Sequence, residues 1–227
     1  MCGRFVVSYT YDELVSFLQG AFDIQEVDLI DWEPRYNVAP GQEVLSVIHD
    51  GKQYRAGTLR WGFVPSWSKD SNSGYKMINA RGETIDKKPS FKESFQQKRC
   101  VLLADAFYEW KRVGSSKQPM CIQMNDQRMF LLAGLWSRTI QEDGSALFTT
   151  TIVTTSSNSL MEDVHDRMPA ILSVEDAMTW LDSSTPIGDV KELIHPYDSD
   201  QMMMYPVSTM VNSVKNDSIE CMIPLQK

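Results

Sequence analysis

Short runs of β-branched, aromatic and leucine residues recur along this chain, and polar turns separate them. Turn-forming residues occupy 114–118 (GSSKQ) and 142–145 (EDGS), and the apolar runs on both sides of each turn are typical of consecutive antiparallel strands. The predicted strands cover 4–9, 44–49, 58–64, 101–110, 120–124, 129–136 and 147–155, with a further short strand after the proline of 163–172.

Helix signals are fewer and mark short elements. Thr10 followed by Glu13 forms a capping box, in which each side chain satisfies a backbone N–H of the first turn, and it opens an amphipathic stretch. Ser90 and Glu93 repeat this signature. Helices are therefore predicted from Thr10 to about Phe22, from Ser90 towards 94–99, from Ser173 over 174–181, and from Thr185, with Pro186 at the first helical position, to about Ile194.

Strands dominate and the helices are peripheral, so the predicted fold class is α+β. We expect a single β-rich domain over residues 1–227, built from antiparallel sheets or an open barrel with short helices around it. The sequence contains no internal repeat, low-complexity tract or linker that would divide it.

Composition describes an ordinary globular chain, with 42% hydrophobic and 23% charged residues. It shows neither a secretory signal nor an apolar run long enough to span a membrane. The four cysteines form no CxxC pair and the three histidines have no metal-ligand spacing, so we expect reduced thiols, no metal and no cofactor. These features favour a cytoplasmic protein, and nothing in the sequence suggests more than a monomer.

A net charge of −8 argues against a surface covered in nonspecific phosphate contacts, which require clustered lysine and arginine. Global charge says little about one site, however, so a local basic groove remains compatible with this sequence.

Five polar segments have no evident role in folding. In the predicted strand through 104–111, Tyr108 and Trp110 share one face, while Phe107, Glu109 and Lys111 share the other. The segments are RYNVAPG (35–41), RWGFVPSWS (60–68), MINARGET (77–84), ADAFYEWK (104–111) and DVHDRMPAIL (163–172).

Each residue of interest in these segments also has an ordinary structural explanation. Trp61 and Trp67 are candidates for the core, Glu109 for a solvated strand position, and His165 beside Asp166 for a loop or cap. Asn79 could form a turn, and the arginines could be surface charges. Taken singly, none of them identifies a site.

The amino terminus changes this view. Removal of Met1 would give Cys2 a free amine and a thiol on adjacent carbons, groups that titrate near ~8 and ~8.5 in unperturbed chains. Such a nucleophile needs a base to take a proton from the ammonium and an acid to protonate a departing oxygen. Glu109 and His165 have suitable side chains, and Asn79 can position a hydroxyl or oxyanion.

The same segments resemble a known family. MCGRF, RYNVAPG, WGFVPSW, INARGET, ADAFYEWK, HDRMP and VNSVKN, in this order from residue 2 to about 216, are similar to the SOS-response-associated peptidase family, also called abasic-site processing proteins. The resemblance implies a β-rich domain whose mature amino terminus is Cys2. It also implies a covalent crosslink between this cysteine and an abasic site in single-stranded DNA.

Residue by residue, the resemblance places the catalytic cysteine at Cys2, the abasic-sensing asparagine at Asn79, the glutamate at Glu109 and the histidine at His165. Some members of the family have a second tryptophan at the position of Ser68. Its absence here affects the expected stacking on DNA bases and not the crosslinking chemistry. The predicted DNA-binding residues are Arg4, Asn37, Pro40, Trp67, Arg81 and Arg167.

The crosslinking chemistry explains why Cys2 must be the first residue. An amine and the open-chain aldehyde of an abasic sugar form a Schiff base, and a neighbouring thiol closes it into a five-membered thiazolidine. An internal cysteine has only an amide nitrogen. Two alternatives stay open. One is an amino-terminal cysteine peptidase, the activity to which the family name refers, and the other is a noncatalytic single-strand DNA binder.

Overall fold

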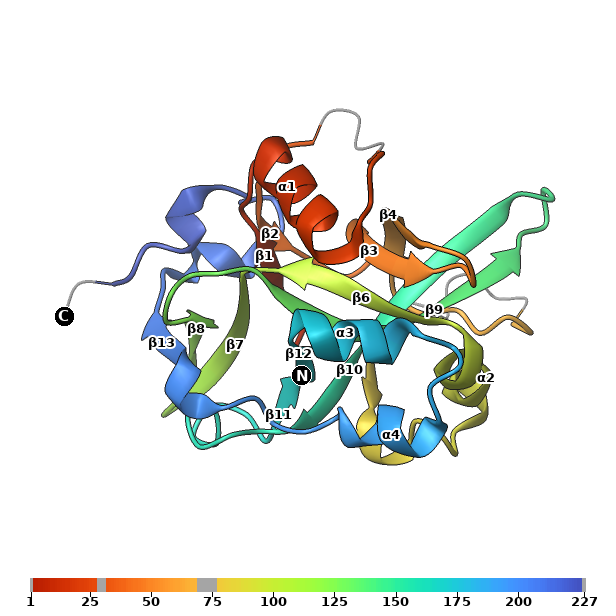
Figure 1. Cartoon of the computed structure of the whole chain (residues 1–227). Helices are drawn as coiled ribbons and strands as arrows, with labels where there is room; N and C mark the ends of the chain where they lie inside the picture. Colours follow the sequence, from red (N-terminus) through yellow and green to blue (C-terminus); the bar gives the residue numbers. More distant parts are fainter. Residues whose placement is uncertain (1, 28–31, 69–76, 226–227) are drawn as a thin grey trace.

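The computed structural model describes residues 2–27, 32–68 and 77–225, and strands are its main regular elements (Figure 1). The strands are β1 (Phe5–Val7), β2 (Arg35–Val38), β3 (Glu43–His49), β4 (Tyr54–Trp61), β5 (Asn79–Arg81), β6 (Arg99–Ala104), β7 (Ala106–Val113), β8 (Ser116–Met124), β9 (Phe130–Ile140), β10 (Ala146–Ser156), β11 (Arg167–Pro169), β12 (Ile171–Leu172) and β13 (Met202–Pro206). The α-helices are α1 (Tyr11–Phe22), α2 (Pro89–Gln97), α3 (Val174–Leu181) and α4 (Ile187–Glu192), and 3-10 turns include η2 (Gly82–Thr84), η4 (Thr209–Asn212) and η5 (Ile219–Cys221).

One sheet closes on itself. Strands β10, β4, β3, β6 and β9 pair in that order, and β9 pairs back to β10, so they form a closed ring. Strand β10 extends past the ring and pairs with β5 and β11. The predicted fold class is confirmed, with one difference. The barrel is closed rather than open, because β10 pairs in parallel with β4 and so completes a ring that antiparallel neighbours alone would leave open.

The second sheet has the order β13-β8-β7-β1-β2 and carries the amino terminus. The predicted strand 101–110 is divided between the two sheets at Asp105. Its N–H donates to the carbonyl of Val6 (3.0 Å), and its carboxylate accepts hydrogen bonds from the backbone and hydroxyl of Ser8. These bonds redirect the chain from β6 in the ring to β7 in the second sheet.

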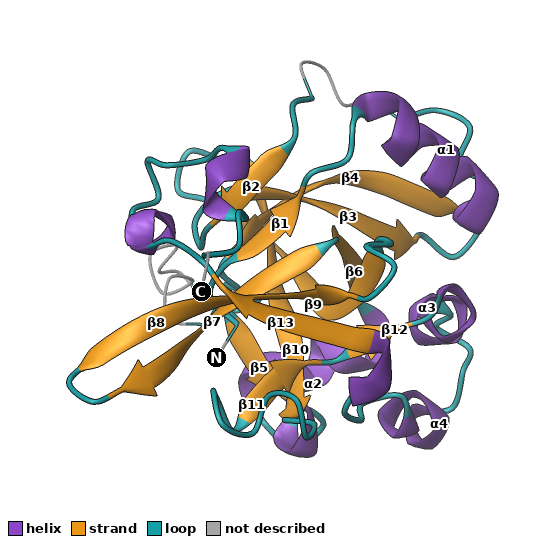
Figure 2. Cartoon of the chain, turned by 90° about the vertical axis from the view of Figure 1, so that its left-hand side faces the viewer, coloured by secondary structure: helices purple, strands orange, loops and turns teal. Residues whose placement is uncertain are grey.

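The helices lie around the strands, as Figure 2 shows. Helix α1 buries Leu14, Leu18 and Phe22, and it begins at the predicted capping box of Thr10 and Glu13. Helix α3 begins at Ser173, whose side chain accepts from the backbone N–H of Asp176.

Two predicted helix starts are wrong by one or two residues. Helix α2 begins at Pro89 after the N-cap Lys88, because proline fits the first turn, where its missing N–H is not needed. Ser90 is therefore inside the helix and is not its cap. Helix α4 begins after Pro186 and not at Thr185.

Strand β4 ends at Trp61, short of the predicted 58–64. Gly62 has φ of 134°, a backbone conformation that other residues rarely adopt, and here the chain leaves the strand. The loop that follows keeps Phe63 and Val64 buried. In the parts of the chain that the structure describes, no helix is both long enough and apolar enough to cross a membrane.

Candidate active site at the amino terminus

Cys2 is fully buried where three strands meet. The N–H of Tyr108 donates to the carbonyl of Arg4 (3.0 Å), so the residues before β1 run beside β7. From the other side, Asn79 Nδ2 donates to the carbonyl oxygen of Cys2 (2.9 Å). Asn79 begins β5, which reaches this position because it pairs in parallel with β10, opposite Ile152. Residues 2, 79 and 108 are thereby brought together.

The electrostatic environment of Cys2 disfavours a thiolate. Burial raises the pKa of the Cys2 thiol well above its ordinary value, and the nearby carboxylate of Glu109 raises it further. Glu109 lies on β7 and is only 3% exposed. In the chain that carries Met1, the surroundings of Cys2 therefore favour the protonated thiol, and Glu109 lies close by.

His165 lies in the loop between β10 and β11. Its Nδ1 accepts a hydrogen bond from the backbone N–H of Arg167 (3.0 Å), and the same nitrogen is 2.9 Å from Asp166 Oδ1. In the neutral ring, the bond from Arg167 leaves the proton on Nε2. In the imidazolium, Nδ1 carries a proton and faces the Asp166 carboxylate. Both protonation states thus have a partner at Nδ1.

Two ion pairs anchor the His165 loop to the elements that carry the other candidate residues. Lys111 Nζ on β7 is 3.6 Å from Asp163 Oδ2. Arg167 pairs with Glu83, which follows β5. The loop is therefore tied both to the strand of Glu109 and to the segment that follows Asn79.

The guanidinium of Arg167 is held within the protein. Nη1 and Nη2 donate to the two oxygens of Glu83 (2.5 and 3.0 Å), and Nη2 also donates to the carbonyl of Thr154 (2.5 Å). Hydrogen bonding to Arg167 is the main cause that lowers the pKa of Glu83. Arg167 is 9% exposed, so the predicted phosphate contact would have to share or replace these bonds.

Arg4 and Asn37 form a second internal network. Arg4 Nη1 donates to Asn37 Oδ1 (2.8 Å) and to the carbonyl of Val211 (2.6 Å), and its guanidinium lies 6.0 Å from the ring centre of Trp110. Asn37 is fully buried, and its Nδ2 donates to the carbonyls of Val211, Ser213 and Asn216. Asn37 thus supports Arg4 from inside the protein, and its side chain has no exposed surface with which to contact DNA.

Asp217 completes this network, and sequence reasoning missed it. Its carboxylate accepts from the backbone N–H groups of Tyr36 (2.6 Å) and Asn37 (2.9 Å) and pairs with Arg35 (2.6 Å). The late segment 211–217, which includes the VNSVKN motif, therefore supports RYNVAPG. The sequence signal was that both segments are among the motifs quoted for the family resemblance, and Asp217 directly follows the second of them.

Besides the partly exposed Arg4, three predicted DNA-binding residues reach the surface. Arg81 is exposed, Pro40 is partly exposed, and Trp67 is 66% exposed. Trp61, the other tryptophan proposed for the core, is fully buried and donates from Nε1 to the carbonyl of Ile78 (2.9 Å). The core explanation is confirmed for Trp61 and wrong for Trp67.

Pro40 and Trp67 are both connected to the end of β4, one through a hydrogen bond of the next residue and the other through the chain. Gly41 N–H, next to Pro40, donates to the carbonyl of Trp61 (2.7 Å), and Trp67 follows in the connection from β4 to β5. Trp61 and Asn79 pair with Thr150 and Ile152 of β10, two residues apart, which is about 7 Å along a strand. The exposed tryptophan thus belongs to the loop that leads into Asn79.

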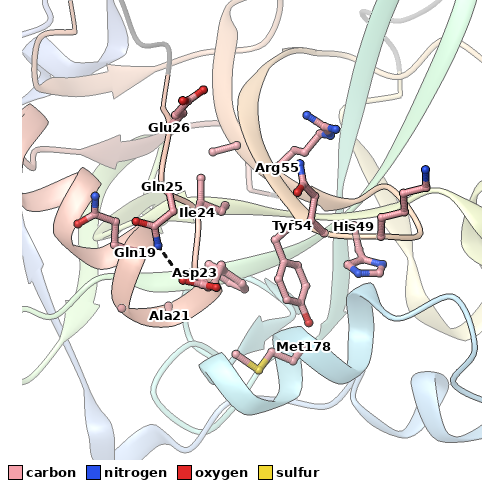
Figure 3. Close-up of a pocket in the computed structure, with 15 residues that line it drawn as sticks. Gln19, Ala21, Asp23, Ile24, Gln25, Glu26, His49, Tyr54, Arg55 and Met178 are labelled. Carbon is pink, nitrogen blue, oxygen red and sulfur yellow. Dashed lines mark hydrogen bonds between the residues drawn. The ribbon is translucent and has the colours of Figure 1, made fainter.

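Among the described residues, no group of three or more His, Cys, Asp or Glu side chains could hold a metal ion. A separate cavity of about 930 Å³ lies between the end of α1 and the β3–β4 hairpin, lined in part by His49, Tyr54, Arg55 and Met178 (Figure 3). None of the predicted site residues lines it.

Comparison with known proteins decides the family. The family model described as SOS response associated peptidase (SRAP) matches residues 1–214. The chain belongs to this family.

Curated relatives extend the match over almost the whole chain. It is 45% identical over 223 residues to the abasic site processing protein YoqW of Bacillus subtilis, covering 97% of this chain and 98% of the relative. It is 34% identical to the abasic site processing protein YedK of Escherichia coli, covering 99% and 100%. It is 36% identical to the abasic site processing protein HMCES of Xenopus tropicalis, covering 84% of this chain and 66% of the relative.

Solved structures share the fold of this SRAP chain. A protein from Bacteroides thetaiotaomicron superposes with a TM-score of 0.83 at 26% identity, covering 95% of this chain and 97% of that one. A phage-related protein from Bordetella bronchiseptica gives a TM-score of 0.70 at 29% identity, with 91% and 94% covered.

Proposed function

We propose that this protein processes abasic sites in single-stranded DNA by forming a covalent thiazolidine through Cys2, after removal of Met1. Curated relatives of nearly full-length overlap are named abasic site processing proteins. The observation that carries the proposal is the placement of Cys2, whose backbone is held by Asn79 and whose thiol lies near the buried Glu109.

The reaction balances without any further reactant. The amine of Cys2 attacks the open-chain aldehyde of the abasic sugar, and loss of water gives an imine. The thiol then adds to the imine carbon, its proton moves to the nitrogen, and a five-membered ring closes. Because this step consumes an S–H, a thiol that keeps its proton at neutral pH is compatible with it.

The neighbouring side chains supply proton transfer and position. Glu109 accepts a proton from the Cys2 ammonium, since it is a buried carboxylate near this residue. His165 protonates the sugar ring oxygen as the ring opens and assists imine collapse. Asn79 holds the Cys2 backbone and disfavours an intact nucleotide. Strand cleavage by β-elimination and reversal of the crosslink are subsidiary activities of the same imine.

DNA contacts surround this centre. The exposed Trp67 stacks on a neighbouring base, for which single-strand binders gain roughly 1–3 kcal/mol, and the partly exposed Pro40 is a further apolar contact for the DNA. Arg81 binds a flanking phosphate. Arg4 and Arg167 remain proposed phosphate contacts that also brace the site. The protein is expected to act as a cytoplasmic monomer without a metal or cofactor.

The peptidase alternative fits the thiol less well. Nucleophilic cysteines of hydrolases have a lowered pKa that supplies thiolate, whereas in the chain that carries Met1 burial and Glu109 raise the pKa of the Cys2 thiol. A noncatalytic binder would leave the buried Glu109 and the terminal cysteine without a role.

The deciding experiment mixes the purified protein with a single-stranded oligonucleotide that contains one abasic site. We expect a shifted band that survives denaturation for the wild type and is absent for Cys2→Ala. Cleavage of peptide substrates without such a band would instead support the peptidase.

A matched control tests the terminal amine. An uncleaved amino-terminal tag ahead of Cys2 should abolish the crosslink and leave DNA affinity largely intact, and intact mass should show the untagged protein lacking one methionine. A crosslink formed by the tagged protein would contradict the amine mechanism.

A further inference from the structure

The segment that leads from the candidate site into α2 has an unusual balance of charge. Over residues 81–93 it contains three acidic residues, and each is paired with a cation from outside the segment. Glu83 pairs with Arg167, Asp86 Oδ2 lies 2.7 Å from Lys191 Nζ, and Glu93 Oε1 lies 2.8 Å from Lys98 Nζ.

Four cations of the segment make no ion pair with a described residue: Arg81, Lys87, Lys88 and Lys92. Arg81 and Lys87 contribute only secondarily to lowering the pKa of Glu83 and Asp86, behind Arg167 and Lys191. On a chain whose net charge is −8, this is a local excess of positive charge.

Local backbone hydrogen bonds hold these cations in one short row along the chain. The N–H groups of Lys87 and Lys88 both donate to the carbonyl of Thr84 (3.0 Å each), and the N–H of Lys92 donates to the carbonyl of Lys88 (2.9 Å). Lys88 is the N-cap of α2 and Lys92 follows within the first helical turn, so both lie at the start of this helix. All four side chains are exposed.

The row starts at the candidate site. Arg81 is two residues beyond Asn79 on β5, and the chain then continues through the 3-10 turn η2, which advances about 2 Å per residue. Lys88 is seven residues after Arg81, at the start of α2. The segment runs from β5 to α2 (yellow in Figure 1), and the ion pair of Asp86 with Lys191 brings α4 next to it.

We infer that Arg81, Lys87, Lys88 and Lys92 form a basic ridge that binds backbone phosphates of the DNA strand on one side of the abasic nucleotide. The inference rests on the proposed function and extends its DNA path beyond the reacting centre. Phosphate is the occupant because the four exposed cations are left without an ion pair among the described residues, whereas the acidic residues between them, Glu83, Asp86 and Glu93, are each paired with another cation. Helix α4 carries the exposed Asp189 and Glu192, so the strand follows the α2 side.

The test compares the triple variant Lys87→Ala, Lys88→Ala, Lys92→Ala with a control triple at exposed cations elsewhere, Lys52→Ala, Lys117→Ala, Arg138→Ala. Both lose the same charge. Equilibrium binding is measured over a range of salt with single strands whose abasic site has been reduced, so that no imine forms. One set of strands has a long flank on the 5′ side of the lesion, and the other set has it on the 3′ side.

For the ridge variant, the slope of log Kd against log salt should be smaller by about 2, since each lost phosphate contact on a single strand contributes about 0.7. The loss should occur with one flank only, and the control triple should match the wild type. An unchanged slope, or an equal change in both triples, overturns the inference.

Crosslinking by the wild type separates this result from the proposed function. Should the wild type crosslink the unreduced strand while the ridge variant keeps the full salt slope, only the ridge is wrong. A ridge variant that crosslinks more slowly at saturating DNA, with unchanged Kd, would also overturn it. Absence of any wild-type crosslink would reject the proposed function itself.

Discussion

At the scale of residues, the candidate site depends on a few polar groups, half-buried or buried, that have fixed partners. Asn79 donates to the carbonyl of Cys2, and the backbone N–H of Arg167 donates to His165 Nδ1. A buried polar group that loses its partner costs about 1–3 kcal/mol, so these bonds hold one arrangement. The atoms that are proposed to react are therefore placed before DNA arrives.

His165→Ala should slow crosslink formation, its reversal, or both by at least tenfold, the lower range for loss of a general acid–base. DNA affinity should change much less, because Arg167 and Glu83 still anchor the segment. Single-turnover crosslinking and equilibrium binding measure the two effects.

The exposed His195 provides the control, since its Nδ1 contacts only the neighbouring carbonyl of Pro196 among the described residues. His195→Ala should leave both quantities unchanged. Equal losses in rate and affinity for His165→Ala would make this histidine a DNA contact.

At the scale of elements, capping and close packing decide where strands and helices fit. The Thr10–Glu13 box starts α1, whereas Lys88 precedes α2 without any side-chain cap. In the barrel, Gly134 allows β9 to lie against β6 and β10, where a larger residue has no room.

Thr10→Ala should lower the free energy of unfolding by about 1 kcal/mol, the usual effect of losing an N-cap oxygen. Lys88→Ala removes a cap residue with no such bond and should change it little. Urea unfolding of both variants measures the difference, and a similar loss in each would mean that the capping box contributes nothing.

Gly134→Ala should destabilise the protein by roughly 1–3 kcal/mol, as overpacking does in well-packed cores. The new Cβ would lie 2.5 Å from Leu102 Cδ1 and 2.9 Å from Cys100 Sγ. Gly57→Ala on β4 meets nothing within 4 Å and should be neutral or slightly stabilising. Thermal unfolding distinguishes them, and equal effects would show that the barrel relaxes around the added carbon.

At the scale of the whole molecule, two cores enclose thiols that are shielded from water. Burial raises the pKa of Cys100 to about 12 and of Cys121 to about 12, and it raises that of Cys2 further. These thiols stay protonated in the folded chain over a pH range in which exposed thiols ionise.

The sign of the resulting pH dependence follows from linkage. The unfolded chain releases thiol protons above about pH 8.5, and the folded chain does not, so this stability is complete below pH 8.5 and is lost as pH rises. Each buried thiol should cost about 1 kcal/mol per pH unit above that point. Urea midpoints from neutral to alkaline pH should fall.

Cys100→Ala should reduce the midpoint at neutral pH, because it leaves a small cavity, but should flatten the alkaline decline. A decline as steep as that of the wild type would mean that Cys100 ionises in the folded protein.

Much of this architecture could be predicted because its signals are local. Alternation over 107–111 correctly placed Phe107 and Tyr108 on opposite faces of the strand, and the two side chains pack in different cores. The helix caps at Thr10 and Ser173 are also where the sequence indicates. The break at Asp105 was missed, because it depends on hydrogen bonds to Val6 and Ser8 across another strand.

The candidate site, too, could be predicted only in part from the sequence. Residue types and motif order identified the family and nominated Cys2, Asn79, Glu109 and His165 before any fold was known. They could not show that Asn37 is buried or that Arg167 is bound to Glu83, since both facts depend on distant parts of the chain.

By itself, therefore, the sequence determined the family, the α+β class and most strands and helices, because these follow from neighbouring residues and from ordered motifs. Tertiary structure alone decided that the barrel closes through parallel pairing of β4 with β10. It also decided which charges are internal and which face outward. Arg4 bonds to Val211, 207 positions away, and no pattern along the chain specifies such a contact, since only folding brings the two together.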